Sequence, residues 1–156
     1  MDRIHWTRIK SSLLKYGKDI SKEMKQKLTD GNKKATGSLI RSIKPYLEQD
    51  DNKYFLYLEM NKYGEYVDSG RRPGSRWPPR EAIRQWIRDK NIRSQYKEEQ
   101  LAFLIQRKIG VRGVEPYKFI HLWYDKMDKL NDMIEDSAKE DLENNINELI
   151  KEYNRQ

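Results

Sequence analysis

The stretch IKPYLEQDDNKYFLYLEM, residues 43–60, decides the fold class, because it is the part of the chain that favours extended structure. It contains two runs, residues 43–48 and 54–60, and the second is rich in tyrosine and phenylalanine, which are good strand formers. Between them, Gln49-Asp50-Asp51-Asn52 has the composition of a turn. The sequence therefore predicts an antiparallel hairpin over about residues 43–60 and leaves a further strand open.

Helical patterns flank this hairpin. Before it, apolar residues recur every three or four positions over residues 6–28, as in an amphipathic helix. After it we predict three shorter helices, at residues 63–69, 79–90 and 98–109. The last of these begins with glutamates and ends with basic residues before Gly110, which suits the helix dipole and a C-terminal glycine.

The C-terminal part is also periodic, with apolar residues at Leu130, Ile134, Ala138, Leu142, Ile146, Leu149 and Tyr153. We predict helix from Pro116 to about residue 153, with a break near Asp136 as the alternative. This stripe either packs on the helix at residues 6–28 or contacts another molecule, and both interpretations stay open. The expected fold is α+β, with a small antiparallel sheet packed with N-terminal, middle and long C-terminal helices. We expect a single domain of residues 1–156 that ends in an acidic amphipathic helix at about 126–153.

Charge is unevenly placed along the chain. The net charge is +7, yet residues 1–120 have a balance of +12 and residues 121–156 a balance of −5. A basic body with an acidic tail suggests polar contacts with a partner or between subunits, or else two solvated faces.

The composition narrows the class of protein. There are no cysteines and only two histidines, His5 and His121, so disulfides and thiolate metal sites are excluded and a histidine site has little support. No apolar run approaches the ~18 residues of a membrane span. With Asp2 and no apolar run at the N-terminus, we expect no signal peptide, no membrane contact and synthesis in a cytoplasm.

A cluster of arginines is the candidate contact surface. Arg80, Arg84 and Arg88 recur every four residues and so share one helical face. The full predicted surface facing a partner or DNA is Arg71, Arg72, Arg76, Arg80, Arg84 and Arg88. Guanidinium groups suit phosphate and carboxylate; the alternative is a solvated face with local salt bridges such as Glu81–Arg84.

The loop before that helix is expected to be fixed in shape by glycines and prolines. These loop-shaping residues are Gly70, Pro73, Gly74, Pro78 and Pro79. We assign Trp86 to the core, on the apolar stripe of its helix, and leave Trp77 unassigned.

No catalytic pattern accompanies these features. Glu65 and Asp68 lie three residues apart, but Arg71 and Arg72 follow at once, so an ion pair across the loop is the better interpretation. Thr36-Gly37-Ser38 is too short for a phosphate loop and is expected to be a helix cap or turn. We therefore expect no enzyme activity, no cofactor and no metal site.

Three segments together resemble the neck and tail-completion proteins of long-tailed bacteriophages. TGSLIRSI at residues 36–43 resembles the T-G-x-L-x-x-S-I element of that family, and YGEYVDSG at 63–70 resembles Y-A-x-x-V-E-x-G. PYKFI at 116–120 is similar to a stretched form of the closing Pro-Phe-aliphatic element. The likeness covers about residues 30–125. Gly64, Asp68 and the pair Tyr117-Lys118 depart from the family pattern.

The resemblance implies a structural virion protein at the head–tail junction, assembled as a ring. Its partners would be other copies of itself and neighbouring connector, stopper, adaptor, tail-tube or terminator proteins, with packaged DNA as a further contact through charge. It would be made in the cytoplasm of a host bacterium. The alternative from the residues alone is a nucleic-acid-binding protein that uses the basic segment at residues 71–93.

Overall fold

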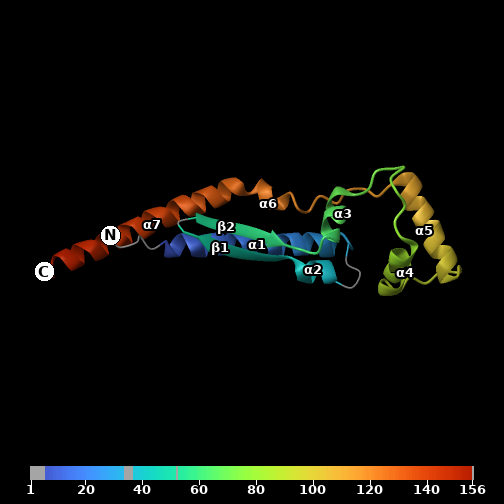
Figure 1. Ribbon diagram of the computed structural model, residues 1–156, viewed down its shortest axis with the longest axis horizontal. Coiled ribbons are helices and arrows are strands. Elements are labelled where there is room, and N and C mark those ends of the chain that lie inside the picture. Colours follow the sequence, from blue (N-terminus) through green and yellow to red (C-terminus); the bar gives the residue numbers. More distant parts are fainter. Residues whose placement is uncertain (1–5, 34–36, 52, 156) are drawn as a thin grey trace. The chain divides into compact units, whose positions relative to one another are not determined.

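A computed structural model describes residues 6–33, 37–51 and 53–155. Within them the fold is α+β, as predicted: it consists of a two-stranded antiparallel sheet and seven helices, of which the C-terminal one is long (Figure 1). The elements follow in the order α1 (Thr7–Asp30), α2 (Ser38–Ser42), β1 (Lys44–Asp50), β2 (Lys53–Glu59), α3 (Tyr63–Ser69), α4 (Arg80–Asp89), α5 (Glu98–Arg112), α6 (Leu122–Asp125) and α7 (Met127–Tyr153).

The hairpin has a tighter turn than the sequence suggested. β1 and β2 pair from Lys44 opposite Glu59 to Asp50 opposite Lys53, so Gln49 and Asp50 belong to the strand. Asn52 lies outside the described residues, and Asp51 has a φ of 47°, in the left-handed region that turn aspartates tolerate. In the described residues, the only other β pairing is an isolated bridge, so the further strand left open is not found there.

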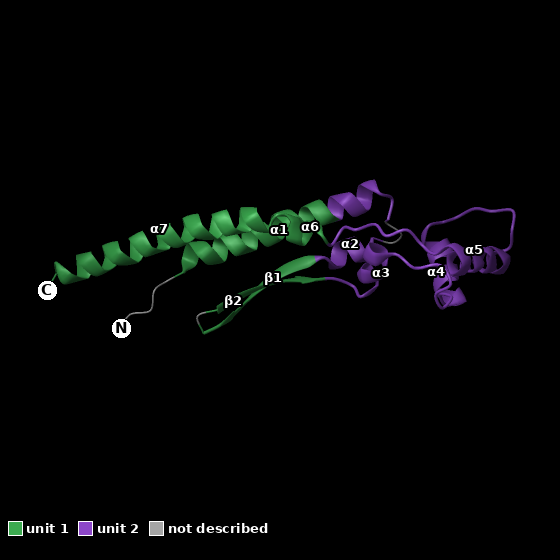
Figure 2. Cartoon of the chain, turned by 90° about the horizontal axis from the view of Figure 1, so that it is seen from above, with its two compact units in different colours: residues 1–24, 44–59, 121–156 green, residues 25–43, 60–120 purple. Residues whose placement is uncertain are grey.

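Contacts divide the chain into two compact units (Figure 2). Unit 1 comprises residues 1–24, 44–59 and 121–156, and unit 2 comprises residues 25–43 and 60–120. The division falls within α1.

Unit 1 is built on the packing of α7, α6 and the hairpin against α1. Tyr16 is 2% exposed; its hydroxyl donates to the Trp123 carbonyl at 2.7 Å, and the two rings meet edge to face. Burial, and then the charge of Glu23, raises the pKa of Tyr16. On the sheet side, a Cβ added at Gly17 would lie 2.7 Å from the Pro45 Cβ, so glycine is what lets β1 approach the helix.

The C-terminal helix differs from the prediction in where it breaks. Residues 116–121 are not helical, and the interruption lies at Lys126, between α6 and α7, while α7 continues unbroken through Asp136. Polar side chains explain the continuity, because Ser137 bonds to Ser12 at 2.6 Å and Asp141 to the first turn of α1. The start of the predicted stripe packs within the chain, since Leu130 is buried, but the stripe is exposed from Leu142 onward.

Unit 2 contains a small core between α4 and α5. Ile83, Ile87 and Ala102 are buried there, and Leu101 and Ile105 pack against them. Trp86 is 42% exposed, so its assignment to the core is wrong. The buried face of α4 is a narrow stripe of two isoleucines one turn apart.

The end of α5 also differs from the prediction. The helix continues to Arg112 and ends at Gly113, whose φ is 73°. Gly110 is a buried helical residue, and a Cβ added there would lie 2.2 Å from the indole nitrogen of Trp77. The glycine is therefore a packing position for a tryptophan that the sequence left unassigned.

Candidate partner-binding site

The loop at residues 70–79 is held to the C-terminal end of α5 by backbone hydrogen bonds. Arg71 and Val114 exchange both amide–carbonyl bonds at 2.8 Å, and the Gly74 amide donates to the Gly110 carbonyl at 2.9 Å. Gly70 has a φ of 69°, and a Cβ there would lie 2.3 Å from the Val114 oxygen. Such pairing fixes the backbone of the loop before any partner binds.

The two prolines at the end of the loop lead into α4. Pro79 occupies the cap position of α4 with a φ of −57°, and the Pro78 carbonyl accepts a bond from the Gln106 side chain at 2.8 Å. A missing amide at this position costs little because the first-turn donors lack helical partners. Pro73 and Gly74 lie exposed at the tip.

This loop encloses an open hollow of about 1060 Å³, which we call the loop hollow. Its lining includes Tyr66, Arg71, Arg72, Arg76, Trp77 and Gln106, and none of its lining residues is acidic. The Arg71 Nη2 donates to the carbonyl oxygen of Arg76, whereas its Nε is buried without a hydrogen-bond partner. The loop hollow is thus cationic and partly aromatic, with an unsatisfied donor at its edge.

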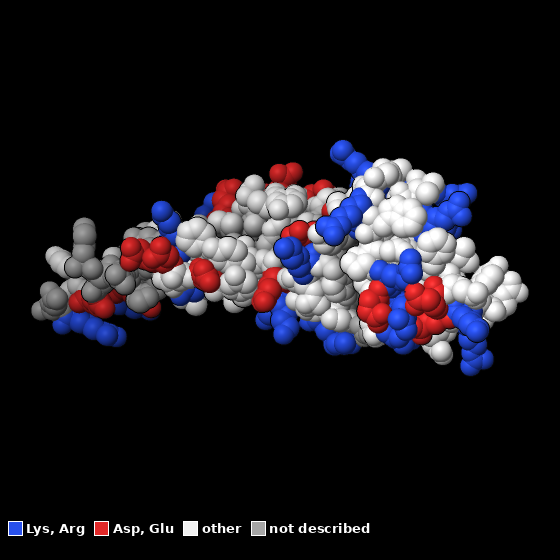
Figure 3. Space-filling view, turned by 45° about the vertical axis from the view of Figure 1, so that its right-hand side comes forward, with Lys and Arg blue, Asp and Glu red and all other residues white. Residues whose placement is uncertain are grey.

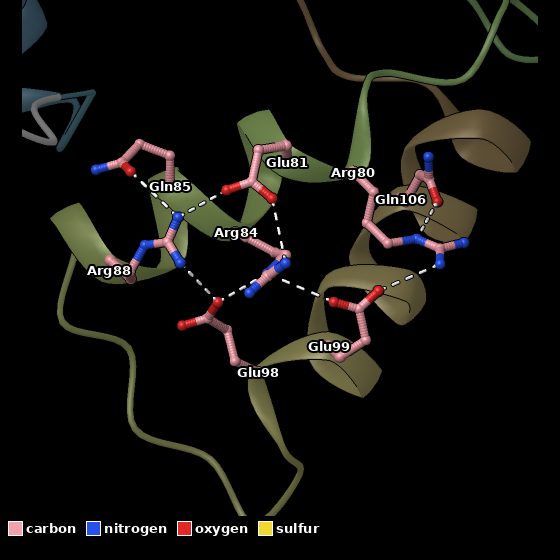
Figure 4. Close-up of polar contacts among 8 residues, drawn as sticks. All are labelled: Arg80, Glu81, Arg84, Gln85, Arg88, Glu98, Glu99 and Gln106. Atoms are coloured by element: carbon pink, nitrogen blue, oxygen red, sulfur yellow. Dashed lines mark hydrogen bonds and ion pairs between the residues drawn. The ribbon is translucent and has the colours of Figure 1, made fainter.

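The arginines of α4 differ from those of the loop hollow because they form ion pairs with carboxylates (Figure 4). Glu98 accepts bonds from Arg84 and Arg88, both at 2.9 Å. Glu81 pairs with the same two arginines, at 3.2 and 2.9 Å. The hydrogen bond to Glu98, followed by the charge of Glu81, raises the pKa of Arg84.

Arg80 completes this network on its other side. It pairs with Glu99 at 3.3 Å, bonds to Gln106 at 3.2 Å and places its guanidinium 5.3 Å from the centre of the Phe103 ring. Figure 3 shows that basic side chains (blue) and acidic side chains (red) lie next to one another on the face that is drawn. The side chains are 35% to 67% exposed, so solvent screens each pair and its contribution to stability is small.

The structure thus separates the six predicted arginines into two groups. Arg80, Arg84 and Arg88 form the local salt bridges of the alternative interpretation, including the expected Glu81–Arg84 pair. Arg71, Arg72 and Arg76 have no ion pair within the part of the chain that the structure describes. Glu98 and Glu99 were assigned from sequence only to the start of their helix, where they suit its dipole, and not to a pairing with these arginines.

The three segments quoted for the phage resemblance meet in unit 2. The side chain of Asn61 bonds to Ser38 at 2.9 Å, and its amide bonds to the Ser42 hydroxyl at 2.9 Å. A Cβ at Gly64 would lie 2.9 Å from Leu39. The amide of Tyr117 donates to the Val67 carbonyl at 3.2 Å. Thr36 lies outside the described residues.

Asp68 belongs to the same junction. Its carboxylate accepts the amide hydrogen of Ile120 at 2.6 Å, and its backbone carbonyl accepts that of Lys118 at 3.1 Å. Among the described residues neither Glu65 nor Asp68 forms an ion pair with Arg71 or Arg72, so the predicted pair across the loop is not found.

Comparison with known proteins finds no family model, curated protein or solved structure that matches this chain. The described residues contain no group of three histidine, aspartate or glutamate side chains that could hold a metal ion. None of their helices combines the length and apolar character that crossing a bilayer requires.

Proposed function

We propose that this chain is a structural protein of a tailed-phage virion, located at the head–tail junction as a neck or tail-completion component. In this role it forms a ring that joins the DNA-filled capsid to the tail and carries out no chemistry of its own. The observation that carries the proposal is the junction of residues 38–43, 63–70 and 116–120. These three short segments resemble one family in that family's order, and the second of them contacts both the first and the third in space.

Two of the departures from the family pattern, Gly64 and Asp68, have local explanations at this junction. Gly64 is buried against Met60 and Leu39, and its missing Cβ leaves room for both side chains. The carboxylate of Asp68 bonds to the Ile120 amide, which ties the second segment to the third. Both substitutions are compatible with the same contact between segments, so they do not weaken the resemblance.

The charge distribution supports a ring. A closed ring requires a heterologous interface, in which two different surfaces of one chain meet on neighbouring copies. The loop hollow carries three arginines that have no carboxylate partner in the described residues, whereas α7 contains nine acidic and three basic residues. Such opposite charges suit contact between copies, or with an acidic connector, stopper, adaptor, tail-tube or terminator protein.

Nucleic-acid binding remains the second candidate because of Trp77. This side chain is 43% exposed in the loop hollow, beside Arg76, and an aromatic ring near free guanidinium groups suits base stacking. The pairing of Arg80, Arg84 and Arg88 with carboxylates reduces the free positive charge available for phosphate. A gel-shift titration across salt tests it: binding that weakens steeply with salt supports this function, and no binding at low salt excludes it.

Virion labelling tests the proposed location. Purified particles of the phage that encodes the chain are treated with an antibody against it and imaged by electron microscopy. The proposal predicts the chain in washed particles and label at the head–tail junction. Label confined to the tail tip, or absence of the chain from particles, would contradict it.

A further inference from the structure

The final part of α7 exposes a row of large apolar side chains in the part of the chain that the structure describes. Up to Asp141 the helix packs on α1, but beyond that point its large apolar side chains are exposed. These side chains are Leu142, Ile146, Leu149, Ile150 and Tyr153, which are 41% to 80% exposed. Figure 1 shows α7 continuing past the first turn of α1. Their spacing places them on one stripe, which we call the free stripe.

Acidic side chains accompany the free stripe. Glu143, Glu148 and Glu152 are exposed, and none of them has an ion pair among the described residues. Two copies of the free stripe laid side by side would bring these glutamates of one copy close to those of the other. This charge disfavours pairing of the free stripe with itself and favours a surface that is both basic and partly apolar.

The loop hollow has that chemistry. It offers three arginines without carboxylate partners, the rings of Tyr66 and Trp77, and the prolines that lead into α4. The backbone bonds that fix the loop mean that little ordering is needed when a partner arrives.

We propose that residues 142–153 of one copy dock in the loop hollow of the next copy, with the glutamates of α7 pairing with Arg72 and Arg76. This inference rests on the proposed function, because it supplies the head-to-tail contact that a ring requires. The contact is heterologous: each copy offers one free stripe and one loop hollow, so the contacts repeat from copy to copy until the ring closes.

Charge reversal in the purified full chain tests the contact. Arg72→Glu with Arg76→Glu, and separately Glu148→Arg with Glu152→Arg, should each weaken self-association at least tenfold in sedimentation velocity. Asp132→Arg with Asp136→Arg is the matched control, because both aspartates are exposed on α7 upstream of the free stripe. The control should assemble as the unmodified chain does, and circular dichroism checks that every variant is folded.

Mixing the two defective variants gives a sharper readout. The arginine variant keeps an intact free stripe and the glutamate variant an intact loop hollow, and their two reversed surfaces complement each other in charge, so the mixture should regain head-to-tail assembly. A chain that carries all four reversals should regain rings. Either result supports the contact.

Three results would overturn the inference. They are an unmodified chain that stays monomeric at all concentrations, an arginine variant that assembles normally, and a mixture that does not pair. An arginine variant that assembles normally while Leu149→Asp abolishes assembly would instead show that the free stripe pairs with its own copy. Rings that persist in the arginine variant would contradict this contact and leave the neck role standing, since virion labelling tests that role separately.

Discussion

The carboxylate of Asp141 on α7 accepts the backbone amide hydrogens of Arg8, at 3.1 and 3.0 Å, and of Ile9, at 3.2 Å. These amides belong to the first turn of α1, where no helical carbonyl is available to them. Asp141 is 3% exposed. Through these hydrogen bonds it acts as the N-cap of α1, although it lies 133 residues from Arg8 in the sequence. This bond joins the first and last long helices of unit 1.

Removal of the Asp141 carboxylate should destabilise unit 1. We expect Asp141→Ala to lower the free energy of unfolding by about 1–3 kcal/mol, because two part-buried amides lose their acceptor. Asp141→Asn keeps one acceptor oxygen and should cost less. Urea unfolding followed by circular dichroism measures both. Equal stability of the alanine variant and the unmodified chain would show that the cap has no energetic role.

The two positive-φ glycines of the loop should respond differently to alanine. At Gly70 a Cβ would meet the Val114 carbonyl at 2.3 Å, whereas at Gly74 it meets nothing within 4 Å. Gly74→Ala should cost about 1 kcal/mol, from backbone strain alone. Gly70→Ala adds a backbone clash and should cost more than about 2 kcal/mol. Thermal unfolding of the two variants gives the comparison, and equal losses would contradict the packing at Gly70.

Neutralising Glu98 and Glu99 should release the arginines of α4. The double variant Glu98→Gln, Glu99→Gln removes four of the ion pairs of that network. We expect a loss of about 1 kcal/mol or less in stability, since the pairs are solvent-exposed, and elution from a heparin column at higher salt. Asp132→Asn with Asp136→Asn makes the same charge change elsewhere on the surface. If both variants shift elution equally, only net charge is being measured, and the network does not mask the arginines.

Periodicity and local composition were sufficient to predict the hairpin and most of the longer helices, but not α2, the tighter turn of the hairpin or the breaks before α7. The hairpin within residues 43–60 and the helix at 63–69 needed only strand formers, turn residues and a terminal glycine. Pairing across long sequence separation was not predictable in this way. Asp141 and Ser137 lie on the same face as Leu130 and Ile134, and small polar residues on an apolar face were the signal that they bond to another helix.

The candidate site shows the same division. Arg80, Arg84 and Arg88 were found from their spacing, and the Glu81–Arg84 pair was anticipated. Glu98 and Glu99, which also pair with these arginines, come from another helix, 10 to 19 residues away. Trp86 was misassigned because a helical stripe predicts which face is apolar and not how much of it a partner covers. The indole of Trp77 packs against Gly110 of α5, where a larger residue would clash, and spacing along the sequence does not reveal this contact.

A conditional nonsense mutation in the phage gene, with electron microscopy of the lysate, asks whether this chain joins the phage head to the tail. We expect DNA-filled heads beside unattached tails under non-permissive conditions, and complete virions when the chain is supplied from a plasmid. Joined, intact virions in the absence of the chain, or a lysate without late particles, would contradict this expectation.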